Sequence, residues 1–184
     1  SYIFKNEGEK DSEAESFIAG VLSKTREITA FLNPIVNSYE RFGKFEAPKY
    51  ISWSHQNRSQ LIRIPAATGE KTRMELRSPD SAINPYLAFS LILAGVYGIE
   101  NSLTLPKEIN ENLYILGEEK LKDIEVLPES LQEALDIAKE SEFIKSVIGS
   151  EVLNKYVELK QTEVDRYNKA IEKENIKRMY FEYI

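Results

Sequence analysis

The sequence predicts an α+β fold in which a small antiparallel sheet packs against helices and the C-terminal half is helical. Three short segments, 50–54, 61–64 and 72–77, alternate apolar and polar residues with the period of two that is typical of strands. Behind Ser12, and again from Pro128 onward, apolar residues recur at helical spacing. Strands and helices therefore occupy separate stretches of the chain.

The first helix is predicted from its first turn. Ser12 and Glu15 form a capping-box signature, and Asn33-Pro34 ends the apolar helical pattern that follows. Residues 34–49 contain prolines and a glycine but few periodic apolar residues, so we expect a long loop before the strands.

Asn84 and Pro85 predict the start of another helix, because asparagine is a favoured N-cap and proline fits the first helical turn. That helix is apolar almost all round, so we expect it to be buried. Residues 102–127 show little periodicity and are predicted to be a linker. The chain would then divide into a helix–sheet–helix part, 1–101, and a helical part, 102–184.

Composition limits the possible functions. The 184 residues carry a net charge of −6, which argues against nucleic acid as a partner, because that partner favours a broad basic surface. The absence of cysteine excludes disulfides and thiol nucleophiles, and the single histidine, His55, excludes a histidine-rich metal site. No apolar stretch is long enough to span a membrane, so we expect no membrane partner. The lack of cysteine favours a cytoplasmic location.

Arginines are concentrated in the segments predicted to be strands. Arg58, Arg63, Arg73 and Arg77 lie within twenty residues, and Glu75 is the only carboxylate within the predicted strands themselves. The period of two places Arg73, Glu75 and Arg77 on one strand face. One glutamate cannot balance four guanidinium groups, so the sequence predicts an anionic ligand, either phosphate or carboxylate. Taken alone, the same row would be typical of a solvated, salt-bridged strand face.

Several motifs in this region recur in the order found in one enzyme family. They are Asn33-Pro34-Ile35-Val36-Asn37-Ser38-Tyr39-Glu40-Arg41, Phe45-Glu46-Ala47-Pro48, Asn57-Arg58-Ser59, Ile62-Arg63-Ile64-Pro65, residues 72–80 and Asn84-Pro85-Tyr86-Leu87-Ala88. With these motifs the chain resembles the C-terminal part of the catalytic domain of glutamine synthetase, of the bacterial dodecameric class. The similarity is most specific from about residue 17 to residue 97.

The resemblance implies ATP-dependent ligation of ammonia to L-glutamate through γ-glutamyl phosphate, in nitrogen assimilation. It implies ATP and Mg²⁺ or Mn²⁺, with L-glutamate and ammonium as the other partners. Family members are cytoplasmic homo-dodecamers, whereas we expect this chain to be a C-terminal fragment, inactive alone and a monomer or small oligomer. A non-catalytic module that acts in assembly, or a related γ-glutamyl-amine ligase, remains the alternative.

The resemblance also implies residue roles. For glutamate, it implies binding by Arg41 and Arg77. Glu46 lies on a flap that closes over the site and helps to deprotonate ammonium, which makes it a catalytic residue. Tyr114 aligns with a tyrosine that some family members adenylylate.

The remaining roles concern phosphate and metal. Arg58 would contact the transferred phosphoryl group as a catalytic residue, with Arg63 in a similar role nearby. Arg73 would contact the phosphates of ATP. Glu75 would be a ligand of one divalent cation, and it is the only credible member of a site that needs about six oxygen ligands.

Overall fold

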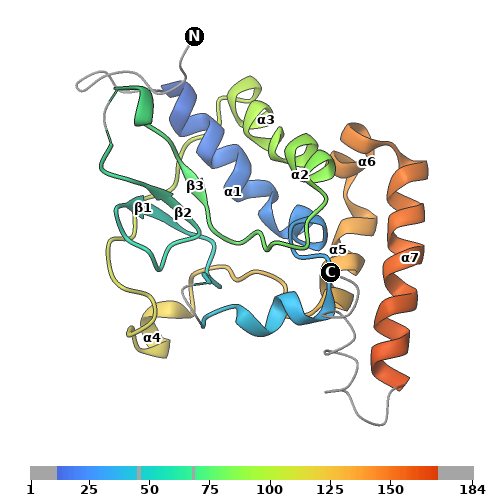
Figure 1. The fold of residues 1–184 in the computed structure, drawn as a ribbon. Coiled ribbons are helices and arrows are strands. Elements are labelled where there is room, and N and C mark those ends of the chain that lie inside the picture. Colours follow the sequence, from blue (N-terminus) through green and yellow to red (C-terminus); the bar gives the residue numbers. More distant parts are fainter. Residues whose placement is uncertain (1–11, 45–46, 68, 170–184) are drawn as a thin grey trace.

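The computed structural model describes residues 12–44, 47–67 and 69–169. In chain order its elements are α1 (Ser12–Leu32), η1 (Val36–Arg41), β1 (Trp53–His55), β2 (Ile62–Ile64), η2 (Gly69–Lys71), β3 (Glu75–Leu76), α2 (Pro85–Ile92), α3 (Ala94–Glu100), α4 (Glu118–Leu121), α5 (Leu131–Glu140), α6 (Glu142–Ile148) and α7 (Ser150–Lys169). Helix α1 runs through the middle, with the strands on one side and α5, α6 and α7 on the other (Figure 1). The predicted α+β class is confirmed.

Helix α1 is packed along its length because it contributes to two hydrophobic clusters. Its first half packs against the sheet, in a cluster of Ile18, Val21, Leu22, Trp53, Leu61, Ile62 and Leu127. Its second half packs against the C-terminal helices, in a cluster that includes Ile28, Phe31, Leu32, Leu131, Leu135, Ile144 and Leu153. Both parts of the predicted division, 1–101 and 102–184, therefore contribute to each of the two clusters.

Helix α7 is fastened to α1 by an aromatic pair. The rings of Phe31 and Tyr156 stack with their centroids 4.1 Å apart, and the Tyr156 hydroxyl donates to the carbonyl of Ala30 at 2.7 Å. Burial raises the pKa of the Tyr156 hydroxyl, so this group remains protonated and keeps its role as a donor.

The sheet is mixed, whereas the sequence predicted an antiparallel one. Strands β2 and β3 are antiparallel as expected, but β1 pairs with β2 in parallel, with Trp53 opposite Ile62. Parallel neighbours usually need a long crossover. Here each of the two strands has three residues, so a short loop is enough to return the chain to the start of β2.

The predicted loop over 34–49 and linker over 102–127 both contain local structure. The 3₁₀ helix η1 lies within the first, and the short helix α4 lies within the second. The end of the first segment meets the end of the second: the N–H of Leu127 donates to the carbonyl of Lys49 at 2.9 Å, and the next residue, Tyr50, forms an antiparallel bridge with Val126. Alternation in the sequence could not show this pairing, because it involves single residues.

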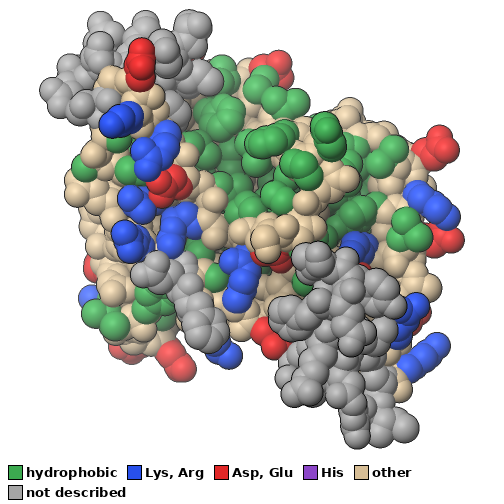
Figure 2. Space-filling view, in the orientation of Figure 1, with side chains coloured by type: hydrophobic (Ala, Val, Ile, Leu, Met, Phe, Trp, Pro, Cys, Tyr) green, Lys and Arg blue, Asp and Glu red, His purple; other side chains and the backbone are tan. Residues whose placement is uncertain are grey.

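The helix predicted after Asn84 begins as expected, but the expectation that it is buried is wrong. The Asn84 side chain accepts hydrogen bonds from the backbone of Tyr86 and Leu87 at 3.0 and 3.3 Å. The helix then divides into α2 and α3, and only one face packs on α1. Tyr86, Phe89 and Leu93 are 82%, 71% and 54% exposed, and hydrophobic side chains gather over α2 and α3 in Figure 2.

Among the described residues, no helix combines the length and the apolar character needed to cross a lipid bilayer.

Candidate active site

Strands β2 and β3 bring a carboxylate between two guanidinium groups. Arg63 lies directly opposite Glu75 in the antiparallel register, so their side chains share one face of the sheet. Arg63 Nη1 lies 3.1 Å from Glu75 Oε2, and Arg73 Nη2 lies 2.8 Å from Glu75 Oε1. Arg73 and Glu75 are therefore paired as the predicted row requires, while the second arginine that contacts Glu75 is Arg63 of β2. Lys and Arg side chains gather over the strands in Figure 2.

The two arginines differ in burial. The Arg63 side chain is 20% exposed and that of Arg73 is 52% exposed. Arg63 also has a buried Nε atom with no hydrogen-bond partner in the described part of the chain. Two positive charges share one carboxylate, and an unused donor remains, so this face suits an anion with several oxygen atoms.

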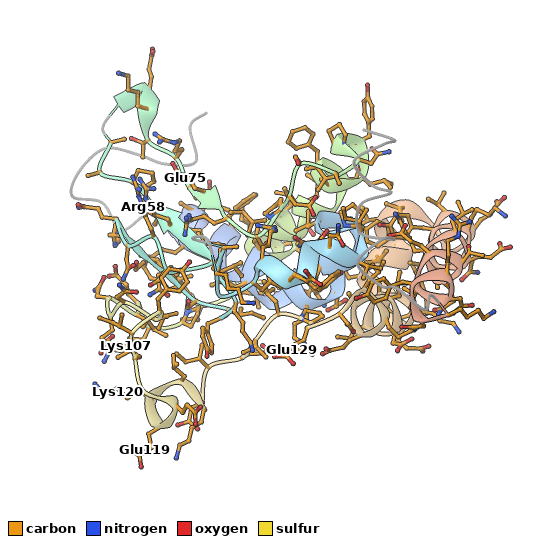
Figure 3. The ribbon with its side chains drawn as sticks, turned by 60° about the horizontal axis from the view of Figure 1, so that its bottom comes forward. Arg58, Glu75, Lys107, Glu119, Lys120 and Glu129 are labelled. Carbon is orange, nitrogen blue, oxygen red and sulfur yellow. The ribbon has the colours of Figure 1, made fainter. Side chains whose placement is uncertain are left out.

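Arg58 lies in the turn between β1 and β2, and its side chain is exposed. This turn is fixed to a distant segment: Asn57 Nδ2 donates to the carbonyls of Asn110 and Glu111, both at 3.0 Å. The Ser59 hydroxyl accepts from the backbone of Leu113, also at 3.0 Å. Figure 3 shows Arg58 at the same end of the molecule as Glu75.

Arg41 lies in a separate network made of neutral acceptors. It is the last residue of η1, and its Nη2 donates to Asn33 Oδ1 at 2.7 Å and to the carbonyl of Ser78. Its guanidinium also lies 5.3 Å from the centre of the Phe42 ring. Burial lowers the pKa of the Arg41 guanidinium, and the nearby Asp80 carboxylate opposes this effect.

Arg77 joins the two groups along the chain, since it follows β3 and precedes Ser78. Its backbone N–H donates to the carbonyl of Leu61 at 2.9 Å, which continues the pairing of β3 with β2. Its side chain is half-buried. The structure therefore brings Arg63, Arg73 and Glu75 into contact and places Arg41 in another network.

Other predicted residues lie apart or outside the described residues. Glu46 lies outside the described residues, so its predicted role on a flap stays a prediction. Tyr114 is exposed in the segment that precedes α4. In the described ranges, no group of three His, Cys, Asp or Glu side chains could hold a metal ion. Glu75 can therefore serve as one ligand of a cation, not as a complete site.

No role was predicted for Asn33, Ser78 or Asp80, although each lies in one of the quoted motifs. The sequence pattern that could have identified them is local: Asn33 directly follows helix α1, and Ser78 and Asp80 follow soon after strand β3. Asn33 is fully buried and Ser78 nearly so. A polar side chain that is buried beside an arginine is a candidate partner for it.

A family model matches almost the whole chain. The model for the glutamine synthetase catalytic domain matches residues 2–179. The chain belongs to the glutamine synthetase family.

Curated relatives agree with this assignment. A glutamine synthetase of Methanosarcina mazei is 47% identical over 163 residues, which cover 86% of this chain and 36% of the relative. A glutamine synthetase of Staphylococcus aureus is 43% identical over 162 residues, with the same coverage. The chain thus spans about a third of the length of the glutamine synthetases that it matches.

Solved structures show the same fold. The ADP complex of GmaS superposes with a TM-score of 0.79 and 28% identity, covering 94% of this chain and 41% of that chain. GmaS without ligand gives a TM-score of 0.79 and 29% identity. Together, the comparisons place the chain with glutamine synthetases or related γ-glutamyl ligases.

Proposed function

We propose that this chain is the C-terminal part of a glutamine synthetase catalytic domain, in an enzyme that ligates ammonia to L-glutamate at the expense of ATP through γ-glutamyl phosphate. The observation that carries the proposal is the arrangement of Arg63, Glu75 and Arg73 on one strand face. Membership of the family supports it.

Phosphate binding falls to the arginines of the sheet. Arg63 and Arg73 hold the phosphates of ATP, which supplies the phosphoryl group, and Arg58 contacts that group as it is transferred. Phosphoryl transfer depends mainly on positioning and charge neutralisation, which clustered guanidinium groups provide. That one GmaS structure is an ADP complex supports a nucleotide site in this fold.

Glu75 is the proposed metal ligand of this chain. Its two oxygens offer about four lone-pair positions, and the hydrogen bonds and ion pairs to Arg63 and Arg73 occupy three of them. One position thus remains for Mg²⁺ or Mn²⁺, whose charge would help to neutralise phosphate. The other ligands would come from parts of a glutamine synthetase that this chain does not contain, so we expect the chain alone to be inactive in synthesis.

Glutamate binding falls to Arg41 and Arg77, whose guanidinium groups suit its carboxylates. Glu46, on the predicted flap, would close over the acyl phosphate, exclude water and accept a proton from ammonium. In the whole enzyme we expect a cytoplasmic homo-dodecamer, and for this chain alone a monomer or small oligomer.

Calorimetric titration with ATP, with and without Mg²⁺, tests the phosphate face. We expect the substitution Arg73→Ala to weaken ATP binding at least tenfold. The matched control is Lys120→Ala, an exposed cation on α4, which Figure 3 shows well away from Glu75. Glu75→Gln should abolish the effect of Mg²⁺ on ATP affinity. Equal ATP affinity in wild type and Arg73→Ala would contradict the proposed phosphate site.

Two other functions predict different results. A related γ-glutamyl-amine ligase would retain ATP binding but, in the whole enzyme, would form product faster with an alkylamine than with ammonium. A non-catalytic assembly module would show no ATP binding and would self-associate, which light scattering measures. The exposed hydrophobic side chains over α2 and α3 are the observation that favours this second alternative.

A further inference from the structure

The guanidinium of Arg41 is held by two segments that are far apart in the sequence. Asn33 ends the buried helix α1, and Ser78 follows strand β3. Arg41 Nη2 donates to the side-chain oxygen of the first and to the backbone carbonyl of the second. An Nη atom carries two hydrogens, so both are used within the protein. One end of the guanidinium is thereby fixed.

Asp80 fixes the helix that carries Arg41. Its Oδ2 accepts from the hydroxyl of Ser38, which lies in η1 one turn before Arg41. Its Oδ1 accepts from the backbone of Ala82 at 2.8 Å, and its own N–H donates to the carbonyl of Leu32 at 3.1 Å. Asp80 is therefore immobilised itself, and it faces Arg41 as a negative charge.

The same cluster retains unused donors. Arg41 Nε, Asn33 Nδ2 and Ser78 Oγ are buried and have no hydrogen-bond partner among the described residues. Leaving a buried donor unsatisfied costs about 1–3 kcal/mol. If the contacts around Arg41 served only to stabilise the fold, we would expect these donors to be used. Contacts that orient an arginine toward a ligand leave some of its donor capacity available.

We propose that Asn33 and Asp80 are positioning residues that fix the orientation of the Arg41 guanidinium, Asn33 directly and Asp80 through Ser38. The inference rests on the proposed function, in which Arg41 binds a carboxylate of glutamate. Neither residue touches the substrate. They remove rotational freedom from Arg41 before glutamate binds, which improves affinity because less ordering accompanies binding.

Nuclear magnetic resonance of the arginine side chains tests the positioning directly. The Nε–Hε signal of Arg41 is assigned by its loss in Arg41→Lys. In the wild-type chain we expect two distinct Nη signals and slow exchange of Hε, because the guanidinium cannot rotate freely. In Asn33→Ala the two Nη signals should merge and Hε exchange should accelerate at least tenfold.

Two further variants separate positioning from general stability. Asn33→Asp keeps an acceptor oxygen at the same place, so the restrained Arg41 signals should persist. Thr29→Val is the matched control, since Thr29 is equally buried one turn earlier in α1 and its hydroxyl donates to the backbone of Thr25. This substitution removes a buried hydroxyl but leaves the contacts of Arg41 with Asn33 and Ser78 intact, so the Arg41 signals should remain unchanged. Asp80→Asn, which removes the charge, should loosen Arg41 partially.

Titration with L-glutamate, followed on the same signals, tests the link to function. We expect Asn33→Ala to weaken glutamate binding about tenfold and Thr29→Val to leave it unchanged. Restrained Arg41 signals in Asn33→Ala would overturn the proposal, as would merged signals combined with wild-type glutamate affinity. If the wild-type chain bound no glutamate, the proposed role of Arg41 in this chain would fail, whereas the signals without ligand would still decide whether Asn33 and Asp80 position it.

Discussion

Helices α1 and α3 cross so closely that one added methyl group should destabilise the fold. A Cβ atom built on Gly98 would lie 2.0 Å from the carbonyl oxygen of Ser16 and 2.7 Å from the Cα of Gly20. Both are backbone atoms, so no flexible side chain can move aside. We therefore choose Gly98→Ala as the perturbation.

The expected loss of stability follows from two opposing effects. To reach an ordinary separation of roughly 3.5 Å, the two helices would have to part by about 1.5 Å. Overpacking of this kind costs about 1–3 kcal/mol or more, and a backbone clash belongs at the upper end of that range. Alanine regains about 1 kcal/mol of helix propensity over glycine. We expect a net loss of about 2 kcal/mol for Gly98→Ala.

Thermal and urea unfolding measure this loss. Trp53, the only tryptophan, packs in the cluster between α1 and the sheet and reports its unfolding by fluorescence. For a chain of this size the melting temperature should fall by roughly 4–8 °C. Gly117→Ala is the control, because a Cβ there meets no atom within 4 Å and the residue has a φ of −69°. A melting temperature for Gly98→Ala equal to that of Gly117→Ala would refute the close crossing.

Three further predictions concern the described interactions. Glu75→Gln removes both ion pairs to the flanking arginines and should lower the free energy of unfolding in urea by about 1 kcal/mol, since neither pair is fully buried; unchanged stability would mean that the pairs do not persist in solution. Tyr156→Phe keeps the ring stacking but loses the hydrogen bond to Ala30, so it should destabilise by about 1 kcal/mol, against no change for Tyr86→Phe, whose ring is exposed. The hydrogen bond from Lys49 lowers the pKa of Glu129, so the stabilisation it provides is present above pH 4.5 and is lost as pH falls through the lowered value. We compare the free energy of unfolding in urea at pH 7 and at pH 3. Because Glu129 is mostly exposed, lowering the pH should cost wild type at most about 1 kcal/mol more than it costs Glu129→Gln. A larger loss in the variant than in wild type would contradict this prediction.

Patterns within a single element predicted the structure well. The capping box located the start of α1, and Asn84 with Pro85 located the start of α2. Alternation along 72–77 predicted that Arg73 and Glu75 share a face, and the ion pair between them confirms it. These features depend on neighbours a few residues away, which the sequence displays directly.

Features that depend on a distant partner could not be predicted in this way. Alternation indicates a strand but not the direction of its neighbour, so the parallel pairing of β1 with β2 was missed. Apolar character indicates that a helix favours burial but not which element buries it. Phe89 is therefore 71% exposed, although it lies in one of the most apolar helices of the chain.

In the candidate site, the arginines differ in the charge of the groups that they contact. Arg63 and Arg73 share the carboxylate of Glu75, so their face carries a net charge of about +1, which a cation at Glu75 would raise toward that needed by a triphosphate. Arg41 donates instead to neutral oxygens of Asn33 and Ser78, and the Asp80 carboxylate acts on it from nearby without appearing among these two acceptors. Sequence spacing grouped Arg63 and Arg73 with Arg58 and Arg77, whereas Arg41 was singled out only by the family resemblance. Their different partners, which only the fold brings to them, support a phosphate side and a glutamate side of one proposed site.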